Sequence, residues 1–188
     1  MDEKEKELIN MILAGETEAF ADLIFPYREK ILTLAYRLTN NEQDALDIAQ
    51  ETFLRAFRYL RHYNFSYCFR HWLLQIAINE AKNILRRRHR ENKAKINLAE
   101  IMRQEKENQL AANFPPKPQP ELISDLESYL KFLTLRERQV LILRDLEGLS
   151  IKETASLLRC SSLSVRVNLS RARNKIRQLW ERKKSQGG

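Results

Sequence analysis

The chain has 188 residues, enough for one large domain or two small ones, with 33 Lys and Arg against 25 Asp and Glu. Its net charge of +8 is uneven, because residues 61–118 sum to +7 and residues 159–188 to +8, each after a more acidic stretch. Two basic zones predict two sites for a polyanion. The charged start, MDEKEKE, excludes a secretory signal there, and no long apolar run predicts membrane insertion, so we expect a cytoplasmic protein.

The first sixty residues predict a series of helices with almost no strand signal. Apolar residues recur every three to four positions, first in residues 2–14, which Gly15 ends, and then from Thr17 to residue 38, where Pro26 should kink or restart the helix. Asn40 and Asn41 break the chain and cap a third helix, EQDALDIAQETFLRAFRYL. Its predicted buried stripe is Ala45, Ile48, Ala49, Thr52, Phe53 and Phe57, with Asp44, Asp47, Glu51, Arg55 and Arg58 towards the other side.

A loop over residues 61–67 is rich in aromatic residues and precedes a helix predicted over 69–88, which ends in RRRHR. Aromatic rings beside a basic helix are typical of sites for single-stranded nucleic acid, where bases stack on rings and cations hold phosphates. We assign Trp72 of this helix to the core. The residues alone do not decide whether Phe65, Tyr67 and Phe69 belong to the core or to a nucleic-acid site.

Residues 89–120 are predicted to be a linker between an N-terminal domain, 1–88, and a C-terminal domain, 121–184. This stretch is polar and ends in NFPPKPQP, whose prolines favour an extended backbone. Transient helix is expected only around residues 98–111. The C-terminal domain starts with a helix at residue 121 and continues with one that Thr134 and Glu137 should cap.

The last two predicted helices form a helix-turn-helix over residues 150–177. Ser150 and Glu153 make an S-x-x-E capping box, and Ser161 or Ser162 can cap the second helix. That helix has an apolar stripe of Val165, Leu169, Ala172 and Ile176, and basic residues on its other faces. A basic second helix is typical of one that enters the major groove of DNA, although a helical hairpin with a solvated basic face would have the same pattern.

No pattern for catalysis or metal binding is found. Cys68 and Cys160 form no C-x-x-C pair, the three histidines have no metal-ligand spacing, and a Gly-rich phosphate loop is missing. We therefore expect no metal, no cofactor and no catalytic residue.

Two long segments resemble the extracytoplasmic-function sigma factors of bacterial RNA polymerase. DALDIAQETFLRAFRYL followed by FRHWLLQIAINEAKNILRRR is similar to their second conserved region, and LTLRERQVLILRDLEGLSIKETASLLRCSSLSVRVNLSRARNKIRQL to their fourth. The resemblance implies an all-α fold of two small domains and a protein without catalysis of its own. It implies binding to the clamp helices and flap of core RNA polymerase, recognition of −35 and −10 promoter elements a little over two duplex turns apart, melting at −10, and control by an anti-sigma factor.

The resemblance also assigns roles to individual positions. The residues that match the motif for docking on the polymerase are Asp44, Asp47, Gln50, Glu51, Phe53 and Arg55. Those that match the −10 loop, which captures a flipped base, and its adjoining helix are Asn64, Phe65, Phe69, Asn79, Lys82, Asn83 and Arg86. Those that match the −35 recognition helix are Ser162, Ser164, Arg166, Val167, Ser170, Arg171 and Arg173.

The chain departs from the family pattern in the helix-turn-helix. Arg159 and Leu163 stand where Gly is usual, and Val167 and Asn168 replace what are commonly Ser and Arg. An alternative function is a helix-turn-helix regulator that binds duplex DNA alone, often as a symmetric dimer. It leaves the QETFLRAF helix and the aromatic loop unexplained. A pure interaction protein is a third possibility, which the clustered arginines disfavour.

Overall fold

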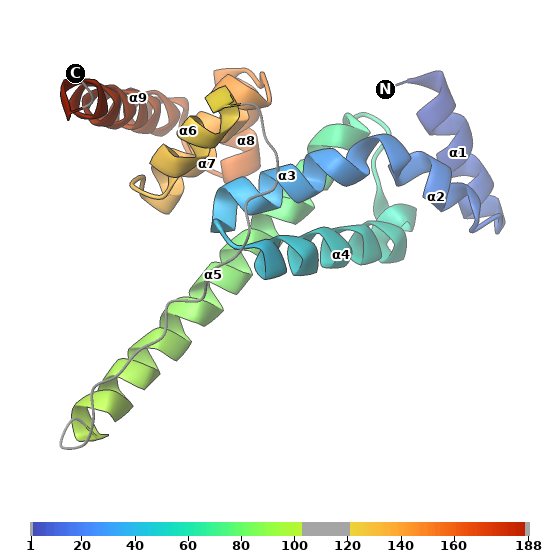
Figure 1. The fold of residues 1–188 in the computed structure, drawn as a ribbon. Coiled ribbons are helices and arrows are strands. Elements are labelled where there is room, and N and C mark those ends of the chain that lie inside the picture. Colours follow the sequence, from blue (N-terminus) through green and yellow to red (C-terminus); the bar gives the residue numbers. More distant parts are fainter. Residues whose placement is uncertain (1, 103–120, 187–188) are drawn as a thin grey trace.

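The computed structural model describes residues 2–102 and 121–186, and these residues form two groups of packed helices (Figure 1). The N-terminal group consists of α1 (Glu3–Ala14), α2 (Ala19–Ile24), the short 3-10 turn η1 (Phe25–Tyr27), α3 (Arg28–Thr39), α4 (Glu42–Tyr59), the 3-10 turn η2 (Leu60–His62) and α5 (Phe69–Met102). The C-terminal group consists of α6 (Glu121–Leu130), α7 (Leu135–Leu141), the π-helical turn η3 (Ile142–Leu146), α8 (Ile151–Leu158) and α9 (Ser162–Gln186). The all-α, two-domain prediction is confirmed.

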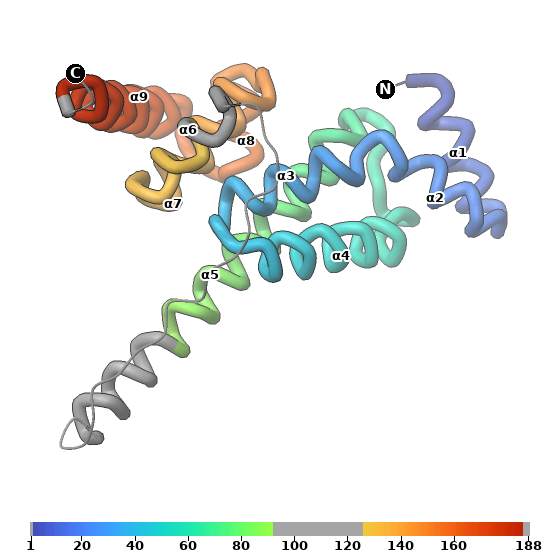
Figure 2. The backbone as a smooth tube through the Cα atoms, viewed as in Figure 1, coloured from blue at the N-terminus to red at the C-terminus, as the bar shows by residue number. Residues whose placement is uncertain are grey.

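The core of the N-terminal group lies between α3, α4 and α5, which pack side by side (Figure 2). Each helix contributes one apolar stripe, as the three-to-four spacing predicts. Fully buried side chains from these and the adjoining elements include Ile9, Leu23, Ile31, Leu34, Leu38, Ile48, Leu60, Phe69 and Leu73. The stripe residues Ala45, Ile48, Ala49 and Thr52 of α4 are buried as predicted, whereas Phe57 is 41% exposed and packs edge-on against Phe20.

Local signals set the turns of this group. Gly15 ends α1 with φ 113°, in the left-handed region that glycine adopts without a Cβ penalty. Pro26 lies in η1 between α2 and α3, so the predicted restart of the helix is confirmed. Asn40 ends α3 in the left-handed conformation, and Asn41 caps α4 by accepting a hydrogen bond from the backbone N–H of Asp44 at 2.9 Å. Thr17 does not cap α2, which begins after Glu18 without a side-chain cap.

Helix α5 is longer than predicted. It runs to Met102, whereas the sequence predicts its end at residue 88 and a linker from residue 89. The added segment, HRENKAKINLAEIM after Arg88, contains no Gly or Pro to stop a helix and consists largely of good helix formers. The rest of the predicted linker, with its proline run, lies outside the described residues.

The C-terminal group is organised by two capping boxes. Thr134 and Glu137 exchange backbone and side-chain hydrogen bonds at the start of α7, and Ser150 and Glu153 do the same at the start of α8. Helices α7 and α8 both pack on α9. The buried hydrophobic residues described in this group are Tyr129, Leu130, Leu133, Val140, Leu141, Ile142, Leu143, Leu149, Ala155, Leu157, Leu158, Val165, Leu169 and Ala172, and Glu137, Gln139 and Thr154 are buried with them.

Candidate nucleic-acid and partner interfaces

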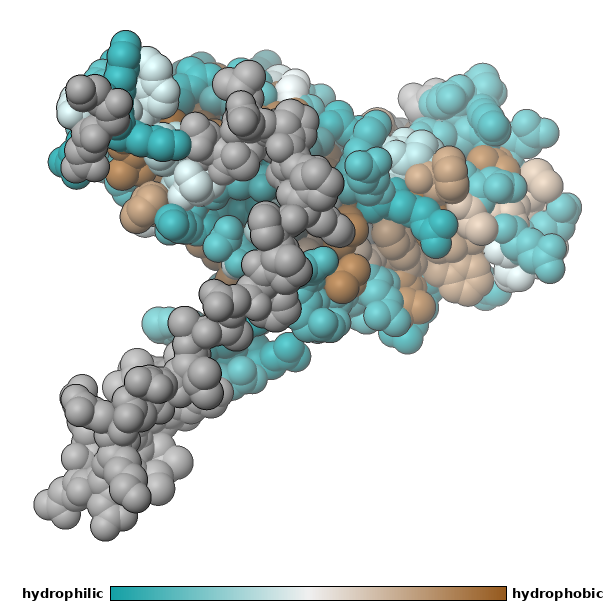
Figure 3. Space-filling view, in the orientation of Figure 1, coloured by the Kyte–Doolittle hydropathy of each residue, from teal (hydrophilic) through white to brown (hydrophobic). Residues whose placement is uncertain are grey.

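One face of α4 is exposed although it carries large apolar residues. Leu46 is 47% and Leu54 42% exposed, and Asp47 and Gln50 are exposed beside them. Apolar patches interrupted by polar residues are visible where α2, α3 and α4 lie (Figure 3). Leu46 and Leu54 are not among the docking residues predicted from the sequence. Their positions outside the buried stripe of Ala45, Ile48, Ala49 and Thr52 are the signal that could have found them.

Other predicted docking residues are engaged inside the N-terminal domain. Asp44 was expected on the exposed side, but it is buried, and its Oδ2 lies 2.9 Å from Nη1 of Arg88. Burial raises the pKa of Asp44, and the Arg88 charge opposes that rise. Nε of Arg55 lies 2.7 Å from Oε1 of Glu51 and 3.2 Å from Oε1 of the buried Glu80. The ion pairs of Asp44 with Arg88 and of Arg55 with Glu80 therefore join α4 to α5.

The aromatic loop presents two rings to solvent. Phe65 is 38% and Tyr67 66% exposed, and Oδ1 of Asn64 accepts a hydrogen bond from the backbone N–H of Ser66 at 2.8 Å, which fixes a local turn. Buried Tyr63 supports the loop through ring contacts to Phe65, Phe69 and Trp72. Burial raises the pKa of Tyr63 to about 12, so its phenol stays protonated and donates to the carbonyl of Tyr67.

Phe69 requires a correction. The resemblance places it among the −10 residues, but its side chain is fully buried, with ring contacts to Tyr27, Tyr63 and Trp72. A ring enclosed in the core has no free face on which a base could stack. Trp72 is partly buried against the same core, in agreement with its assignment from the sequence.

The four polar residues predicted on α5 share one exposed face. Asn79, Lys82, Asn83 and Arg86 follow each other at spacings of three, one and three, which places them on one side of a helix. All four are exposed. The aromatic loop precedes α5 directly, so rings, amides and cations belong to one continuous part of the chain.

The outer face of α9 carries most of the residues predicted for the second basic site. The Oγ of Ser161 accepts a hydrogen bond from the Ser164 N–H at 3.1 Å, which settles the cap on Ser161 and begins α9 at Ser162. Arg166, Val167, Ser170 and Arg171 are exposed, and Ser162 and Ser164 are half-buried. Arg173 is also exposed, but its Nε and Nη2 lie 2.9 and 2.6 Å from the two carboxylate oxygens of Asp145 in η3. Arg173 thus joins α9 to η3.

The two domains touch through charged side chains. Arg70, at the start of α5, donates to the Glu147 carbonyl at 3.0 Å and lies 2.6 Å from Oε2 of Glu147. Near it, Nε2 of His71 is 3.8 Å from Oε1 of Glu153 in α8. Arg138 of α7 donates to the carbonyl of Leu38, at the end of α3, at 2.8 Å, and burial lowers the pKa of this guanidinium. These contacts of Arg70, His71 and Arg138 together form the interdomain contact.

Comparisons with known proteins identify the family of both domains. Residues 23–91 match Sigma-70 region 2, and residues 124–176 match Sigma-70, region 4. The chain is 32% identical over 182 residues to the RNA polymerase sigma-H factor of Pseudomonas aeruginosa, with 93% of this chain and 92% of that protein covered. The chain belongs to the sigma factors of RNA polymerase, in the extracytoplasmic-function class.

Two further similarities agree with this family. The ECF RNA polymerase sigma-E factor of Escherichia coli strain K12 is 29% identical over 184 residues, with 93% and 95% of the two chains covered. The structure of the sigma factor RpoE with the anti-sigma factor NepR from Bartonella quintana has a TM-score of 0.70, 22% identity and coverage of 86% and 96%. CnrH in complex with the cytosolic domain of CnrY has a TM-score of 0.66, 24% identity and coverage of 95% and 97%. The two structures support the fold.

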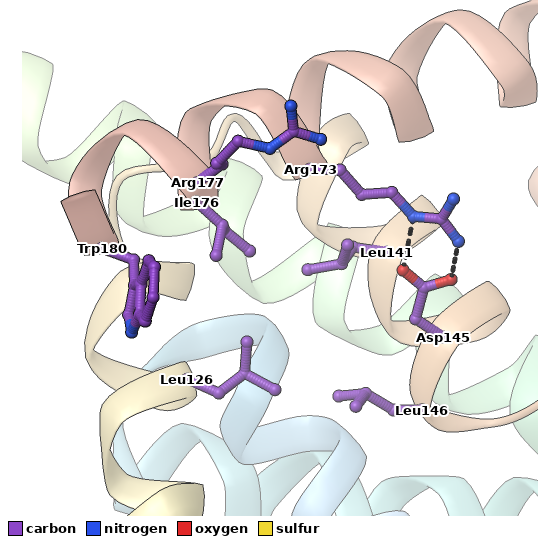
Figure 4. Close-up of a pocket in the computed structure, with 8 residues that line it drawn as sticks. All are labelled: Leu126, Leu141, Asp145, Leu146, Arg173, Ile176, Arg177 and Trp180. Atoms are coloured by element: carbon purple, nitrogen blue, oxygen red, sulfur yellow. Dashed lines mark hydrogen bonds and ion pairs between the residues drawn. The ribbon is translucent and has the colours of Figure 1, made fainter.

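As a member of this family, the sigma factor directs promoter-specific initiation by RNA polymerase, with the N-terminal group as region 2 and the C-terminal group as region 4. Region 4 also has a groove of about 360 Å³ that the sequence analysis did not anticipate (Figure 4). Apolar side chains from α6, α7, η3 and α9 line it, and the Arg173–Asp145 pair lies at one side. The apolar lining consists of Leu126, Leu141, Leu146, Ile176 and Trp180, of which Trp180 is 53% exposed.

Within the part of the sigma factor that the structure describes, no three or more His, Cys, Asp and Glu side chains are grouped as a metal site would require. No helix among these residues is both long enough and apolar enough to cross a bilayer.

Proposed function

We propose that the sigma factor uses one surface for docking on the polymerase and two surfaces for promoter recognition. The exposed face of α4, with Leu46, Asp47, Gln50 and Leu54, docks on the clamp helices of core RNA polymerase. The aromatic loop and the polar face of α5 hold the −10 element, and the outer face of α9 enters the major groove at −35.

The strongest support for this proposal is the exposed loop directly before α5. Phe65 and Tyr67 are exposed rings in the loop that leads into α5, and the exposed face of α5 includes Lys82 and Arg86. A base stacked on an aromatic ring contributes roughly 1–3 kcal/mol, enough to offset much of the few kcal/mol needed to unstack and flip it. A regulator that binds intact duplex DNA needs no such pair of surfaces, so this region favours a role in melting the −10 element.

We also propose partners for the apolar surfaces. An exposed tryptophan above an apolar groove suits a short amphipathic segment of a protein partner, and the polymerase flap is the partner that the family resemblance suggests. RpoE of Bartonella quintana was solved with the anti-sigma factor NepR, and CnrH with the cytosolic domain of CnrY. An anti-sigma factor that covers α4 or this groove would block polymerase binding.

The test uses the full chain with core polymerase on a promoter that has both elements. A fluorescent adenine analogue in the −10 non-template strand should brighten when the wild-type holoenzyme opens the duplex. The variant Phe65→Ala/Tyr67→Ala should bind core polymerase and the −35 duplex normally but lose most of the signal. Arg171→Ala is the matched control, because it should weaken −35 binding to the duplex and leave the fluorescence change on a promoter with a pre-melted −10 segment unchanged.

The result also separates the two candidate functions. A stand-alone regulator would bind duplex DNA without core polymerase, and its binding would not depend on the loop. Equal opening by the loop variant and the wild type would remove the −10 role from the loop.

A further inference from the structure

The first two turns of α9 expose two apolar side chains on the surface proposed to face DNA. Leu163 is 68% and Val167 39% exposed, and their spacing of four residues places them one turn apart on the same face. The buried side of the helix is formed by Val165, Leu169 and Ala172 instead. Packing of region 4 therefore does not require an apolar residue at 163 or at 167.

The polar side chains around these two residues are partly committed to other contacts. Nδ2 of Asn168 donates to the Ser164 carbonyl at 2.7 Å and lies 3.4 Å from the Ser164 Oγ. An asparagine amide is a common reader of adenine, and here the internal hydrogen bond holds it along its own helix. The exposed surface that remains at the start of α9 consists of Leu163, Arg166, Val167 and Ser170.

In the major groove, an apolar side chain has one distinctive apolar partner, the C5-methyl group of thymine. The N-terminal residues of a recognition helix are the ones that reach base edges, and Leu163 and Val167 lie in the first two turns. Exposed Arg166 and Arg171 nearby supply positive charge that would hold this face against the phosphates. We propose that Leu163 and Val167 read thymine methyl groups of the −35 element, an inference that rests on the proposed −35 role of α9.

The experiment changes the DNA by one methyl group at a time. The holoenzyme first selects its −35 sequence from promoters randomised in that element. Each thymine of the selected sequence is then replaced by deoxyuridine, which lacks only the C5-methyl, and holoenzyme binding is measured. Loss of one buried methyl should weaken binding about fourfold at each contacted thymine and leave the other positions unchanged.

Protein variants then assign each methyl to a side chain. With Leu163→Ala, replacement of its thymine should no longer weaken binding, and Val167→Ala should do the same for a second thymine. Phe132→Ala is the matched control, since Phe132 is a 55% exposed apolar residue in the turn between α6 and α7, and it should keep the full difference between thymine and deoxyuridine.

The outcomes distinguish this inference from the proposed function. Selection of a −35 sequence with no effect of deoxyuridine at any position would overturn the inference and leave the proposed function standing. The same conclusion would follow if both alanine variants kept the wild-type discrimination. Failure to select any −35 sequence would overturn the −35 role of α9, and this inference with it.

Discussion

At the scale of single residues, Arg159 is a non-glycine residue whose backbone conformation lowers the stability of the fold. It ends α8 with φ 49°, in the left-handed region, and its N–H bonds the carbonyls of Ala155 and Ser156. Glycine is preferred at this position of a helix end because it has no Cβ to meet the neighbouring carbonyl. With Arg159 in place of the usual Gly, the turn therefore keeps its geometry, and the strain falls on this one residue.

Arg159→Gly should raise the free energy of unfolding of region 4 by roughly 1 kcal/mol, the typical penalty of a side chain in the left-handed region. Urea unfolding followed by far-UV circular dichroism measures it. Arg159→Ala removes the same charge but keeps the Cβ, so its stability should stay near that of the wild type. A gain of equal size in the alanine variant would attribute the effect to the charge instead of the backbone.

Asp47 is the acidic docking candidate best suited to a test, because Asp44 is buried and Glu51 bonds to Arg55. Asp47→Lys should weaken binding to core polymerase about three- to tenfold at low salt, and less at high salt, since exposed charges are screened. Glu16→Lys makes the same charge change at another exposed site and should not weaken binding. Unchanged affinity of the Asp47 variant, with unchanged helix content, would remove this residue from the docking surface.

At the scale of helices, Glu137 joins two elements of region 4. Its carboxylate accepts from the backbone N–H of Thr134 at 2.9 Å and lies 2.7 Å from Nζ of Lys175 in α9. Burial alone would raise the pKa of Glu137, but the hydrogen bonds from Lys175 and Thr134 outweigh it and the net pKa is lowered. A capping group thus also fixes how α7 packs on α9.

Because folding lowers the pKa of Glu137, its contribution to the free energy of unfolding depends on pH in a definite way. The contribution of Glu137 is fully present above its ordinary value of 4.5 and is lost as the pH falls through the lower folded-state pKa. Glu137→Gln should therefore cost about 1–3 kcal/mol at pH 7, and this difference from the wild type should shrink below about pH 4. Hydrogen exchange of amides in α7 and α9 measures it.

Glu181→Gln, at an exposed position of α9, provides the control for this pH series. Its difference from the wild type should stay small throughout. A difference for Glu137→Gln that persisted at low pH would mean that packing, and not the carboxylate charge, is what the substitution removes.

At the scale of the whole molecule, the interdomain contact brings α8 of region 4 against the start of α5, next to the aromatic loop. The family resemblance places the −35 and −10 elements a little over two duplex turns apart, on the order of 70–90 Å. Each domain has a radius of gyration of only about 13 Å. If the two domains bind these elements as proposed, we expect the interdomain contact to open before both elements are bound.

Glu147→Arg should open the interdomain contact, because it replaces the charge-assisted bond to Arg70 by repulsion. That bond is worth roughly 1–3 kcal/mol. The two cysteines, Cys68 and Cys160, lie one in each domain, so energy transfer between dyes attached to them should fall in this variant. Arg70→Glu/Glu147→Arg should restore the transfer, and Glu181→Arg should not change it. Equal transfer in Glu147→Arg and the wild type would show that this pair does not hold the domains together.

The sequence alone determined the features that depend on near neighbours along the chain. The caps at Asn41, Thr134 and Ser150 follow from contacts between residues three apart, so a short stretch contains all the information. The extent of α5 beyond residue 88 could also have been predicted, because no Gly or Pro interrupts that stretch before Met102. The roles of individual interface residues stay predictions.

Only the tertiary structure decided which side chains remain free for partners. Phe69 and Asp44 have the residue types and spacing of surface contacts, but the packing of α5 against its neighbours encloses both. Arg70 meets Glu147 across 77 residues of chain. Helical periodicity defines the face on which a side chain lies, whereas burial and charge pairing depend on which other face it meets, and that information lies in segments distant in the sequence.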